Sequence, residues 1–307
     1  MQDVKTLFRK CDANPLLRAT DFADACRLIA SNPVQIDGEV AIMLSFVPYG
    51  AQAPVQTYVA RSADGASFEL ADSPFVVPAD LPAPFCHAKD YQNCQIAQVD
   101  GTYLIVSQAV VNRKQAAVLF RSPDLQSFEP ISILPVSSQT RACVVPGRID
   151  GKVHLLWSDS AEVTDHWGTL WTASSEDLKA WGDARPVMHN GNIATAVPST
   201  PVRTDKGWLM ANYQSSQPCD GWRTYSSGLL LGLDAPGTVV ATTPGYFFRV
   251  TEVYEWAGID GNVCPPCGFL IDEQADTIDL YYTGAGISLC RATGPLSTLL
   301  ERCNGAN

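Results

Sequence analysis

The sequence predicts an all-β protein, folded as a single five-bladed β-propeller over residues 1–307. Two observations carry this prediction. A short phrase, an Asp-Gly turn followed by β-branched and apolar residues, occurs five times at intervals of roughly 50 to 70 residues. A second phrase, a strand followed by a polar turn and a short return, follows each copy in register. Convincing amphipathic helices are scarce, and the best candidate is the short stretch Ala19–Ala30.

Each copy of the first phrase predicts a hairpin between the two inner strands of a blade, because Asp-Gly favours a tight hairpin turn. The copies are IDGEVAIML from Ile36, VDGTYLIVS from Val99, IDGKVHLLW from Ile149, TDKGWLMANY from Thr204 and, loosened, ADTIDLYYT from Ala275. The second phrase reads VARSADGASFE from Val59, LFRSPDLQSFE from Leu119 and WTASSEDLKAW from Trp171, with weaker copies from Leu230 and Leu289. A β-sandwich is the alternative fold, but it does not explain a period this long.

The charge of the chain limits its partners. The formal net charge of -11 and the pI of about 4.7 disfavour nucleic acid and anionic membrane surfaces. No apolar stretch reaches the roughly 18 residues that a membrane span needs. The first residues, MQDVKTLFRKCDANPLL, have no apolar core of signal-peptide length. We therefore expect a cytoplasmic protein, and the sequence makes no prediction about its oligomeric state.

The ten cysteines are scattered along the chain and are expected to be reduced, buried thiols rather than a disulfide framework. The single CxxC, CPPC at 264–267, has no second pair with the spacing of a zinc ribbon. The sequence therefore predicts no metal site and no cofactor.

The segments just before the Asp-Gly turns are expected to line the propeller axis. They are IASNPVQ (29–35), DYQNCQI (90–96), RACVVPGRI (141–149), TAVPSTPV (195–202) and NVCPPCGFL (262–270). They are rich in Asn, Ser, Thr, Gln and Pro. Polar groups that meet from several blades suit a polyhydroxylated small molecule or oligosaccharide, which needs many neutral hydrogen bonds. The other interpretation is that these segments are turns at the junctions between blades.

Several phrases carry a family resemblance from one end of the chain to the other. They are NPLL (14–17), VARSADGASFE (59–69), DLKAWGDARPV (177–187), GWLMANY (207–213), LLLGLDAPGTVVATTPG (229–245), YEWAGIDGNVCPPCG (254–268) and LYYTGAGISLCRAT (280–293). In these phrases the chain resembles glycoside hydrolase family 130, the mannoside phosphorylases and β-mannosidases. The resemblance implies a five-bladed propeller and a carbohydrate-active enzyme.

The positions that the resemblance marks as catalytic are substituted. The family's Glu-Asp-Pro-Arg motif, whose Asp is the general acid, falls on Gln92, Asn93, Cys94 and Gln95. Further charged residues of the family, two of which are arginines, fall on Ser45, Ser158, Gln214 and Gly286. Since Asn93 cannot donate a proton as an acid, the family mechanism fails as it stands. Without the arginines, phosphate lacks its charge-assisted hydrogen bonds, so phosphorolysis is disfavoured.

Three residues are candidates for a different acid/base set. Asp90 lies three residues before Asn93, and a short rearrangement of the chain puts its carboxylate in the place of the lost acid. Asp165 and His166 lie in the loop LLWSDSAEVTDHWG, where a base oriented by a carboxylate would sit beside Trp167. The competing interpretation of all three is a solvated surface charge.

The candidate substrate-binding residues are polar residues of the axial segments and of the family positions. They are Asn32, Gln92, Asn93, Gln95, Ser158, Gln214, Glu255 and Asn262. Glu255 matches a glutamate of the family, and it either holds a loop or touches ligand.

The sequence thus favours a glycosidase-like enzyme that acts on a glycoside or related polyhydroxylated compound with a non-family acid/base set. Two alternatives stay open, because function depends on the site and not on the fold. One is a sugar-binding protein that has lost turnover. The other is an enzyme for a non-sugar metabolite on the same scaffold.

Overall fold

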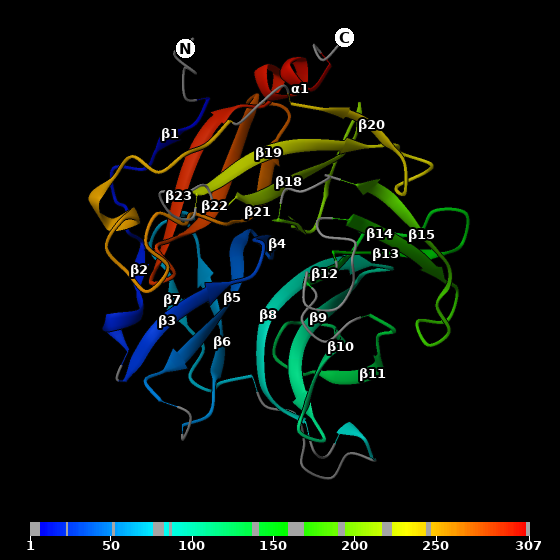
Figure 1. The fold of residues 1–307 in the computed structure, drawn as a ribbon, viewed down its shortest axis with the longest axis horizontal. Helices are drawn as coiled ribbons and strands as arrows, with labels where there is room; N and C mark the ends of the chain where they lie inside the picture. The colour runs from blue at the N-terminus through cyan, green and yellow to red at the C-terminus, as the bar shows by residue number, and fades with distance from the viewer. Residues whose placement is uncertain are drawn as a thin grey trace.

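The computed structural model describes residues 7–22, 24–50, 53–75, 83–85, 88–136, 141–158, 169–189, 194–216, 223–243 and 247–304, with the side chains of 189, 194–198, 213–216, 223–225 and 304 left out. Its strands form five antiparallel sheets, which are the blades of a five-bladed propeller, as the sequence predicts. Figure 1 shows the sheets around a common centre, with β4, β8 and β12 near the middle.

The blades follow one another along the chain. Blade 1 holds β3 (Ala25–Ala30), β4 (Val34–Ile36), β5 (Glu39–Pro48), β6 (Gln56–Ser62) and β7 (Glu69–Leu70). Blade 2 holds β8 (Ala88–Val99), β9 (Thr102–Val111), β10 (Lys114–Ser122) and β11 (Glu129–Ile133). Blade 3 holds β12 (Arg141–Val144), β13 (Val153–Ser158), β14 (Thr169–Ser175) and β15 (Gly182–His189). Blade 4 holds β16 (Ala194–Pro198), β17 (Val202–Thr204), β18 (Gly207–Ser216), β19 (Arg223–Leu231) and β20 (Val239–Thr242).

Blade 5 is built from both ends of the described chain. Its strands β21 (Pro266–Asp272), β22 (Thr277–Gly284) and β23 (Ser288–Pro295) come from the C-terminal part. The N-terminal strands β1 (Arg9–Lys10) and β2 (Leu17–Arg18) pair antiparallel with β23 and complete this sheet. The ring is therefore closed by main-chain hydrogen bonds between segments far apart in the sequence.

The Asp-Gly phrases form the predicted hairpins. Ile36 pairs with Glu39, and Val99 pairs with Thr102, each across one Asp-Gly turn. Both residues of each turn have positive φ, 51° and 83° in the first and 51° and 72° in the second. This conformation is that of a type I′ turn, which matches the twist of the flanking strands and which Asp-Gly adopts at low cost.

The second phrases form the outer hairpins through a repeated Ser-x-Asp turn. Asp64, Asp124 and Asp177 each accept the main-chain N–H groups two and three residues ahead, at 2.7 to 2.9 Å. These hydrogen bonds lower the pKa of all three carboxyl groups below the usual value of 3.8. The aspartate thus takes the place of a main-chain acceptor and fixes the turn.

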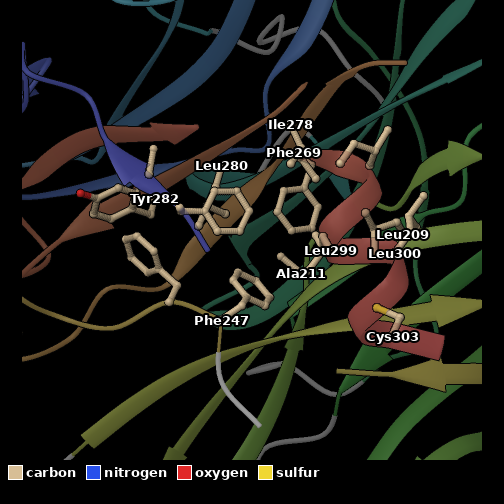
Figure 2. Close-up of a cluster of buried hydrophobic side chains, with 14 of the residues drawn as sticks. Leu209, Ala211, Phe247, Phe269, Ile278, Leu280, Tyr282, Leu299, Leu300 and Cys303 are labelled. Carbon is tan, nitrogen blue, oxygen red and sulfur yellow. The ribbon is translucent and has the colours of Figure 1, made fainter. Parts of the chain in front are cut away.

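The core lies between the blades. Apolar side chains of neighbouring sheets form five buried clusters, one of which joins blades 4 and 5 to the helix α1 (Leu296–Asn304). In Figure 2, Leu209 of β18, Phe269 of β21 and Leu299 of α1 come together in this cluster. Each blade therefore buries its faces against its neighbours.

The best candidate for a helix, Ala19–Ala30, does not form one. Ala19–Asp21 form a single 3-10 turn, η1, and Ala25–Ala30 form β3. Leu28 and Ala30 alternate in burial with half-buried residues, which is a strand period rather than a helical one. A second 3-10 turn, η3, covers Val253–Glu255. No helix in the described ranges is long and apolar enough to cross a membrane.

Candidate functional site

A belt of polar side chains crosses the propeller axis. The Nδ2 of Asn32 donates to the Ile96 carbonyl at 2.8 Å, and its Oδ1 accepts from the Ile96 N–H at 2.7 Å. The Thr200 hydroxyl lies 3.2 Å from Asn32 Oδ1, and the Thr200 N–H donates to Gln95 Oε1 at 2.8 Å. These residues are buried and come from blades 1, 2 and 4. Asn32 and Gln95, expected to bind substrate, are thus engaged by the protein itself.

The remaining two blades join the same belt. The Cys143 thiol of β12 lies 3.5 Å from the carbonyl of Ser199, the neighbour of Thr200. Gly268 of β21 comes so near that a Cβ there would lie 2.6 Å from Asn32 Cβ, so the close approach requires glycine. All five blades therefore meet at this level, and a ligand on the axis must lie on one side of the belt.

We call the end of the axis where the innermost strands begin the mouth. In four of the five blades, described polar residues precede the belt along the chain. They include Arg27 of β3, Asp90, Gln92 and Asn93 of β8, Arg141 of β12 and Asp260 ahead of β21. The Asp-Gly hairpins lie at the opposite end of the axis. The mouth is the candidate site.

The innermost strand of blade 2 contains two successive β-bulges at the mouth. The pairing of β8 with β9 shifts between Lys89 and Gln92, and again between Gln92 and Gln95. Asp90 and Asn93, one in each bulge, have positive φ of 55° and 52°. Asp and Asn tolerate a left-handed backbone better than other residues with a side chain, and in a bulge this conformation changes the direction of the side chain. Because of the bulges, these two side chains do not follow the regular alternation of side chains along β8.

The Asn93 amide is held by the neighbouring strand. Its Nδ2 donates to the Gln108 Oε1 on β9, and its Oδ1 is buried without a hydrogen-bond partner in the described part of the chain. The Gln92 carbonyl accepts from the Ser107 hydroxyl at 3.2 Å, and Gln92 lies opposite Gln108 in register. Neutral amides, those of Asn93 and Gln108, therefore meet in this part of the mouth.

Asp90 is the partly exposed carboxylate beside these amides. Its side chain is 22% exposed. Its Oδ1 accepts the N–H of Val55, which precedes β6, at 3.2 Å, and its Oδ2 lies 3.9 Å from the Nζ of Lys89. The carboxylate is thus anchored on one oxygen, while the other faces a flexible, exposed cation.

Blade 3 brings a guanidinium group that the sequence analysis does not single out. Arg141 begins β12 and pairs in register with Ser158, the last residue of β13, which is buried. Burial raises the pKa of the Cys267 thiol of β21 to about 12, and the positive charge of Arg141 opposes this rise. Arg141 therefore lies within electrostatic range of Cys267 in blade 5, and Ser158 lies beside it on β13.

Blades 5 and 1 meet at the mouth through an ion pair. The Arg27 guanidinium contacts the Asp260 carboxylate, and their side chains are 41% and 30% exposed. Gly286, in the turn between β22 and β23, has φ +70°, and a Cβ there would overlap the Asp260 carboxylate. The family resemblance places an aspartate at position 286. This chain has a glycine there, and the space that a side chain would take is occupied by the Asp260 carboxylate.

Glu255 holds a loop. Its side chain is fully buried and contacts the Lys10 ammonium group of β1. Its carboxylate also accepts the Thr251 N–H at 2.7 Å, the Glu252 N–H at 2.9 Å and the Tyr282 hydroxyl at 2.8 Å. These contacts fill its acceptor sites. Of the two interpretations of Glu255, this geometry favours the loop-holding one.

The other predicted site residues divide into two groups. Asn262 is half-buried in the same loop, with φ +66°. Asp165 and His166 lie outside the described residues, and Gln214 lies in β18 with its side chain among those left out. Their roles stay predictions.

Two thiols lie buried near the axis. Cys94 and Cys143 are buried, and burial raises the pKa of Cys94 to about 12 and that of Cys143 well above its usual value. Cys264 and Cys267 do not form a disulfide, as expected. No group of three or more His, Cys, Asp or Glu side chains suited to a metal ion occurs among the residues that the structure describes.

Comparisons with known proteins agree with this architecture. No family model matches the chain. It is 25% identical over 251 residues to a β-1,2-mannobiose phosphorylase of Listeria innocua, covering 80% of this chain and 67% of that one. It is also 25% identical over 250 residues to a 1,2-β-oligomannan phosphorylase of Thermoanaerobacter, covering 77% of this chain and 79% of that one.

Solved structures show the same fold. The β-1,2-mannobiose phosphorylase of Listeria innocua in complex with β-1,2-mannobiose superposes with a TM-score of 0.80 at 20% identity, covering 97% of this chain and 99% of that one. A GH130 structure described with glycoside hydrolases that target β-1,2-mannosidic linkages in Candida mannan gives a TM-score of 0.71 at 15% identity, with 93% of each chain covered. The chain therefore resembles the mannoside phosphorylases and glycoside hydrolases of family GH130 in sequence and has their five-bladed propeller fold.

Proposed function

We propose that this chain acts on a β-mannoside, or a closely related glycoside, bound at the mouth, with an acid/base set different from that of its relatives. The observation that carries the proposal is the pair of bulges in β8, which keeps Asp90 and Asn93 in a left-handed conformation on the innermost strand. The similarity to mannoside phosphorylases over most of the chain supports the substrate class.

Asp90 is the proposed carboxylate of this set. Its Oδ1 accepts the Val55 N–H, which holds the carboxylate on the same strand as Asn93. Because the Asn93 amide has no acidic proton, Asp90 is proposed as the general acid, which protonates the glycosidic oxygen as the bond between sugar and leaving group breaks. His166, with Asp165 beside it in the sequence, is proposed as the base that takes a proton from the attacking water.

The test is turnover of β-1,2-mannobiose with and without inorganic phosphate, with mannose and sugar phosphate quantified by chromatography. We expect release of mannose that does not depend on phosphate. Asp90→Asn is expected to lower this rate roughly 100-fold or more while the affinity for the disaccharide is kept. Asp12→Asn, in an exposed ion pair with Arg9, is the matched control. Unchanged turnover in Asp90→Asn would remove Asp90 from the mechanism.

A second candidate function is binding without turnover. It is favoured by Asn93, whose amide donates to Gln108 and has no acidic proton. A ligand that binds only the folded protein raises its melting temperature by mass action. If β-1,2-mannobiose raises the melting temperature but no mannose forms on long incubation, the chain is a sugar-binding protein. If no sugar shifts the melting temperature, a non-sugar metabolite becomes the ligand to seek. A cytoplasmic location belongs to the same set of proposals.

A further inference from the structure

The cleft between blades 3 and 4 holds a polar cavity that the proposed function does not use. Its volume is about 370 Å³, which is within the range of small-molecule sites. Leu156 of β13 and Leu170 of β14 belong to the apolar cluster that packs blade 3 against blade 4. Two residues away on the same face of these strands, His154 and Thr172 line the cavity. Since β13 ends at the mouth with Ser158, the cavity lies toward the other end of the strand.

Three neighbouring strands of blade 3 supply the floor of this cavity. Figure 1 shows β13, β14 and β15 side by side. His154 of β13 lies opposite Ser174 of β14 in register, and Thr172 of β14 lies opposite Arg185 of β15. All four residues line the cavity. Because residues directly opposite each other share a face of the sheet, an imidazole, two hydroxyls and a guanidinium group lie on one face.

The Thr172 hydroxyl points to a ligand. The residue is 3% exposed, and its Oγ1 is buried without a hydrogen-bond partner in the described part of the chain. The methyl group of Thr172 faces blade 4, since a Cβ at Gly237 would lie 2.7 Å from Thr172 Cγ2. A buried polar atom without a partner costs free energy, and in a folded protein it calls for an explanation such as a bound water or ion. The cavity beside Thr172 is the place where such a partner can bind.

The charges around the imidazole favour an anion. Burial lowers the pKa of His154, and the positive charges of Lys152 and Arg185 lower it further. A hydrogen bond with the Ile149 main chain and the negative charge of Asp150 oppose this shift. Two cations thus act on the imidazole against one carboxylate, so an anion beside it is stabilised.

The Arg185 guanidinium group is held in place by blade 4. Its Nη1 donates to the Gly237 carbonyl at 3.0 Å. A Cβ at Gly237 would lie 2.7 Å from its Nη2, so glycine allows this close approach. A guanidinium group has five N–H donors, and this one hydrogen bond leaves others for a ligand. The group is therefore positioned before a ligand arrives, which lowers the entropic cost of binding.

The carboxylates of the cavity lie at its exposed edge. The Asp183 side chain is 78% exposed, and its Oδ2 lies 3.9 Å from the Lys152 Nζ. Asp150 and Asp234, the second from the loop after β19, are also exposed. Carboxylates only accept hydrogen bonds, so these suit hydroxyl or ammonium groups carried by the same ligand as the anion.

We propose that the cleft between blades 3 and 4 is an oxyanion site, in which Thr172, His154 and Arg185 bind the carboxylate or phosphate group of a small metabolite that also carries hydrogen-bond donors. The site is separate from the mouth, and the inference goes beyond the proposed function. A ligand held there binds only the folded protein and therefore stabilises it by mass action.

The test measures the dissociation constants of sulfate and of L-malate by titration calorimetry. Sulfate represents tetrahedral oxyanions, and L-malate represents hydroxy acids. We expect wild type to bind at least one of them, with one ion per chain.

The pH dependence of sulfate binding tests the role of His154, because sulfate keeps its charge between pH 6 and pH 8. An anion favours the imidazolium form, so sulfate should bind several-fold more tightly at pH 6 than at pH 8, and His154→Gln should abolish this difference. The other charged groups that face the cavity have ordinary pKa values outside this range: Lys152, Arg185, Asp150, Asp183 and Asp234.

Thr172→Val separates binding from packing, because it removes the hydroxyl and keeps the shape of the side chain. We expect Thr172→Val and Arg185→Gln each to weaken binding roughly tenfold, the loss expected for a hydrogen bond between charged and neutral groups. Thr172→Val should not lower the melting temperature of the ligand-free protein, because it removes an unsatisfied polar atom. Thr204→Val is the matched control. The buried Thr204 hydroxyl donates to the Gly207 carbonyl at 2.8 Å, so this variant should lose stability and keep its anion affinity.

Three results would exclude the site. The first is that neither sulfate nor L-malate binds to wild type. The second is that an anion binds but Thr172→Val and Arg185→Gln leave its affinity unchanged. The third is a loss of affinity in Arg141→Gln alone, which would place the anion at the mouth. The proposed function has a separate test, because that test measures release of mannose at the mouth.

Discussion

Two carboxylates of the same loop, Glu255 and Asp260, differ in almost every respect. Glu255 is fully buried and is surrounded by the Lys10 ammonium group, the Tyr282 hydroxyl and two main-chain N–H groups. Asp260 is 30% exposed, and its carboxylate contacts the Arg27 guanidinium group. The family resemblance points to the first and not to the second. The comparison teaches that a carboxylate saturated by the protein maintains the fold, while one left half-satisfied at a rim is available to a ligand.

Removing the charge of Glu255 is the strongest way to test this difference. Glu255→Gln leaves the buried Lys10 ammonium group without its counter-charge, and breaking a buried ion pair costs about 3–5 kcal/mol. We expect a loss of this size in the free energy of unfolding, measured by urea denaturation. The double variant with Lys10→Met should be less destabilised than the sum of the single variants. A loss below about 1 kcal/mol would show that the network does not hold the loop.

The belt offers a second fold-maintaining residue. Asn32→Ala removes both hydrogen bonds to the main chain of Ile96 and leaves the Ile96 N–H and carbonyl buried without that partner. Each orphaned group costs about 1–3 kcal/mol, so we expect a loss of about 2–6 kcal/mol in chemical denaturation. Thr200→Val, which removes the hydroxyl contacts to Asn32 and Gln95 but no main-chain partner, is the milder comparison. A sugar affinity that falls while stability is kept would instead return Asn32 to the binding site.

Asp260→Asn is expected to have little effect on stability. An exposed or half-exposed ion pair contributes about 0–1 kcal/mol, so the melting temperature should change little. The contrast with Glu255→Gln is the point of the measurement, because both substitutions remove one negative charge from the same loop. A loss as large as that of Glu255→Gln would break the comparison and make Asp260 a structural residue.

A substitution in a Ser-x-Asp turn is expected to have the smallest effect on stability, and the effect should depend on pH only under acidic conditions. Asp64, Asp124 and Asp177 have pKa values lowered by main-chain N–H donors in the fold. A group whose pKa is lower in the folded state stabilises the protein above its unfolded pKa, and this stability is lost as the pH falls below about 4. In Asp124→Asn, the dependence of the urea midpoint on pH should be shallower below pH 4 than in wild type. An unchanged slope would contradict the role of the turn.

The architecture was predictable from the sequence because it depends on local signals. Asp37-Gly38 and Asp100-Gly101 form the expected hairpins, since an Asp-Gly pair adopts two positive φ angles almost anywhere. The stretch Ala19–Ala30 looked like a helix because it has few apolar positions. A six-residue strand is too short to distinguish the two-residue period of a strand from the 3.6-residue period of a helix.

The site was predictable only in part. The sequence directs attention to Asn93 and Asp90, and the structure places both in bulges at the mouth. The sequence does not reveal Asp260 as a candidate. This residue lies in the triplet IDG, which looks like another hairpin turn, and its partner Arg27 is 233 residues away. The sequence also does not show that Asn32 and Gln95 form hydrogen bonds within the belt. A polar residue looks the same in a sequence whether its side chain faces a ligand or another blade.

The closure of blade 5 by β1 and β2 has a consequence for biosynthesis. These strands leave the ribosome before the other strands of the propeller, but their pairing partner β23 is made after the strands of blades 1 to 4. Until then the edge of β1 is unpaired, and Lys10 has no Glu255 to neutralise it. The ring therefore closes only after β23 has been translated, so nascent chains carry an open strand edge, the kind of surface that chaperones protect.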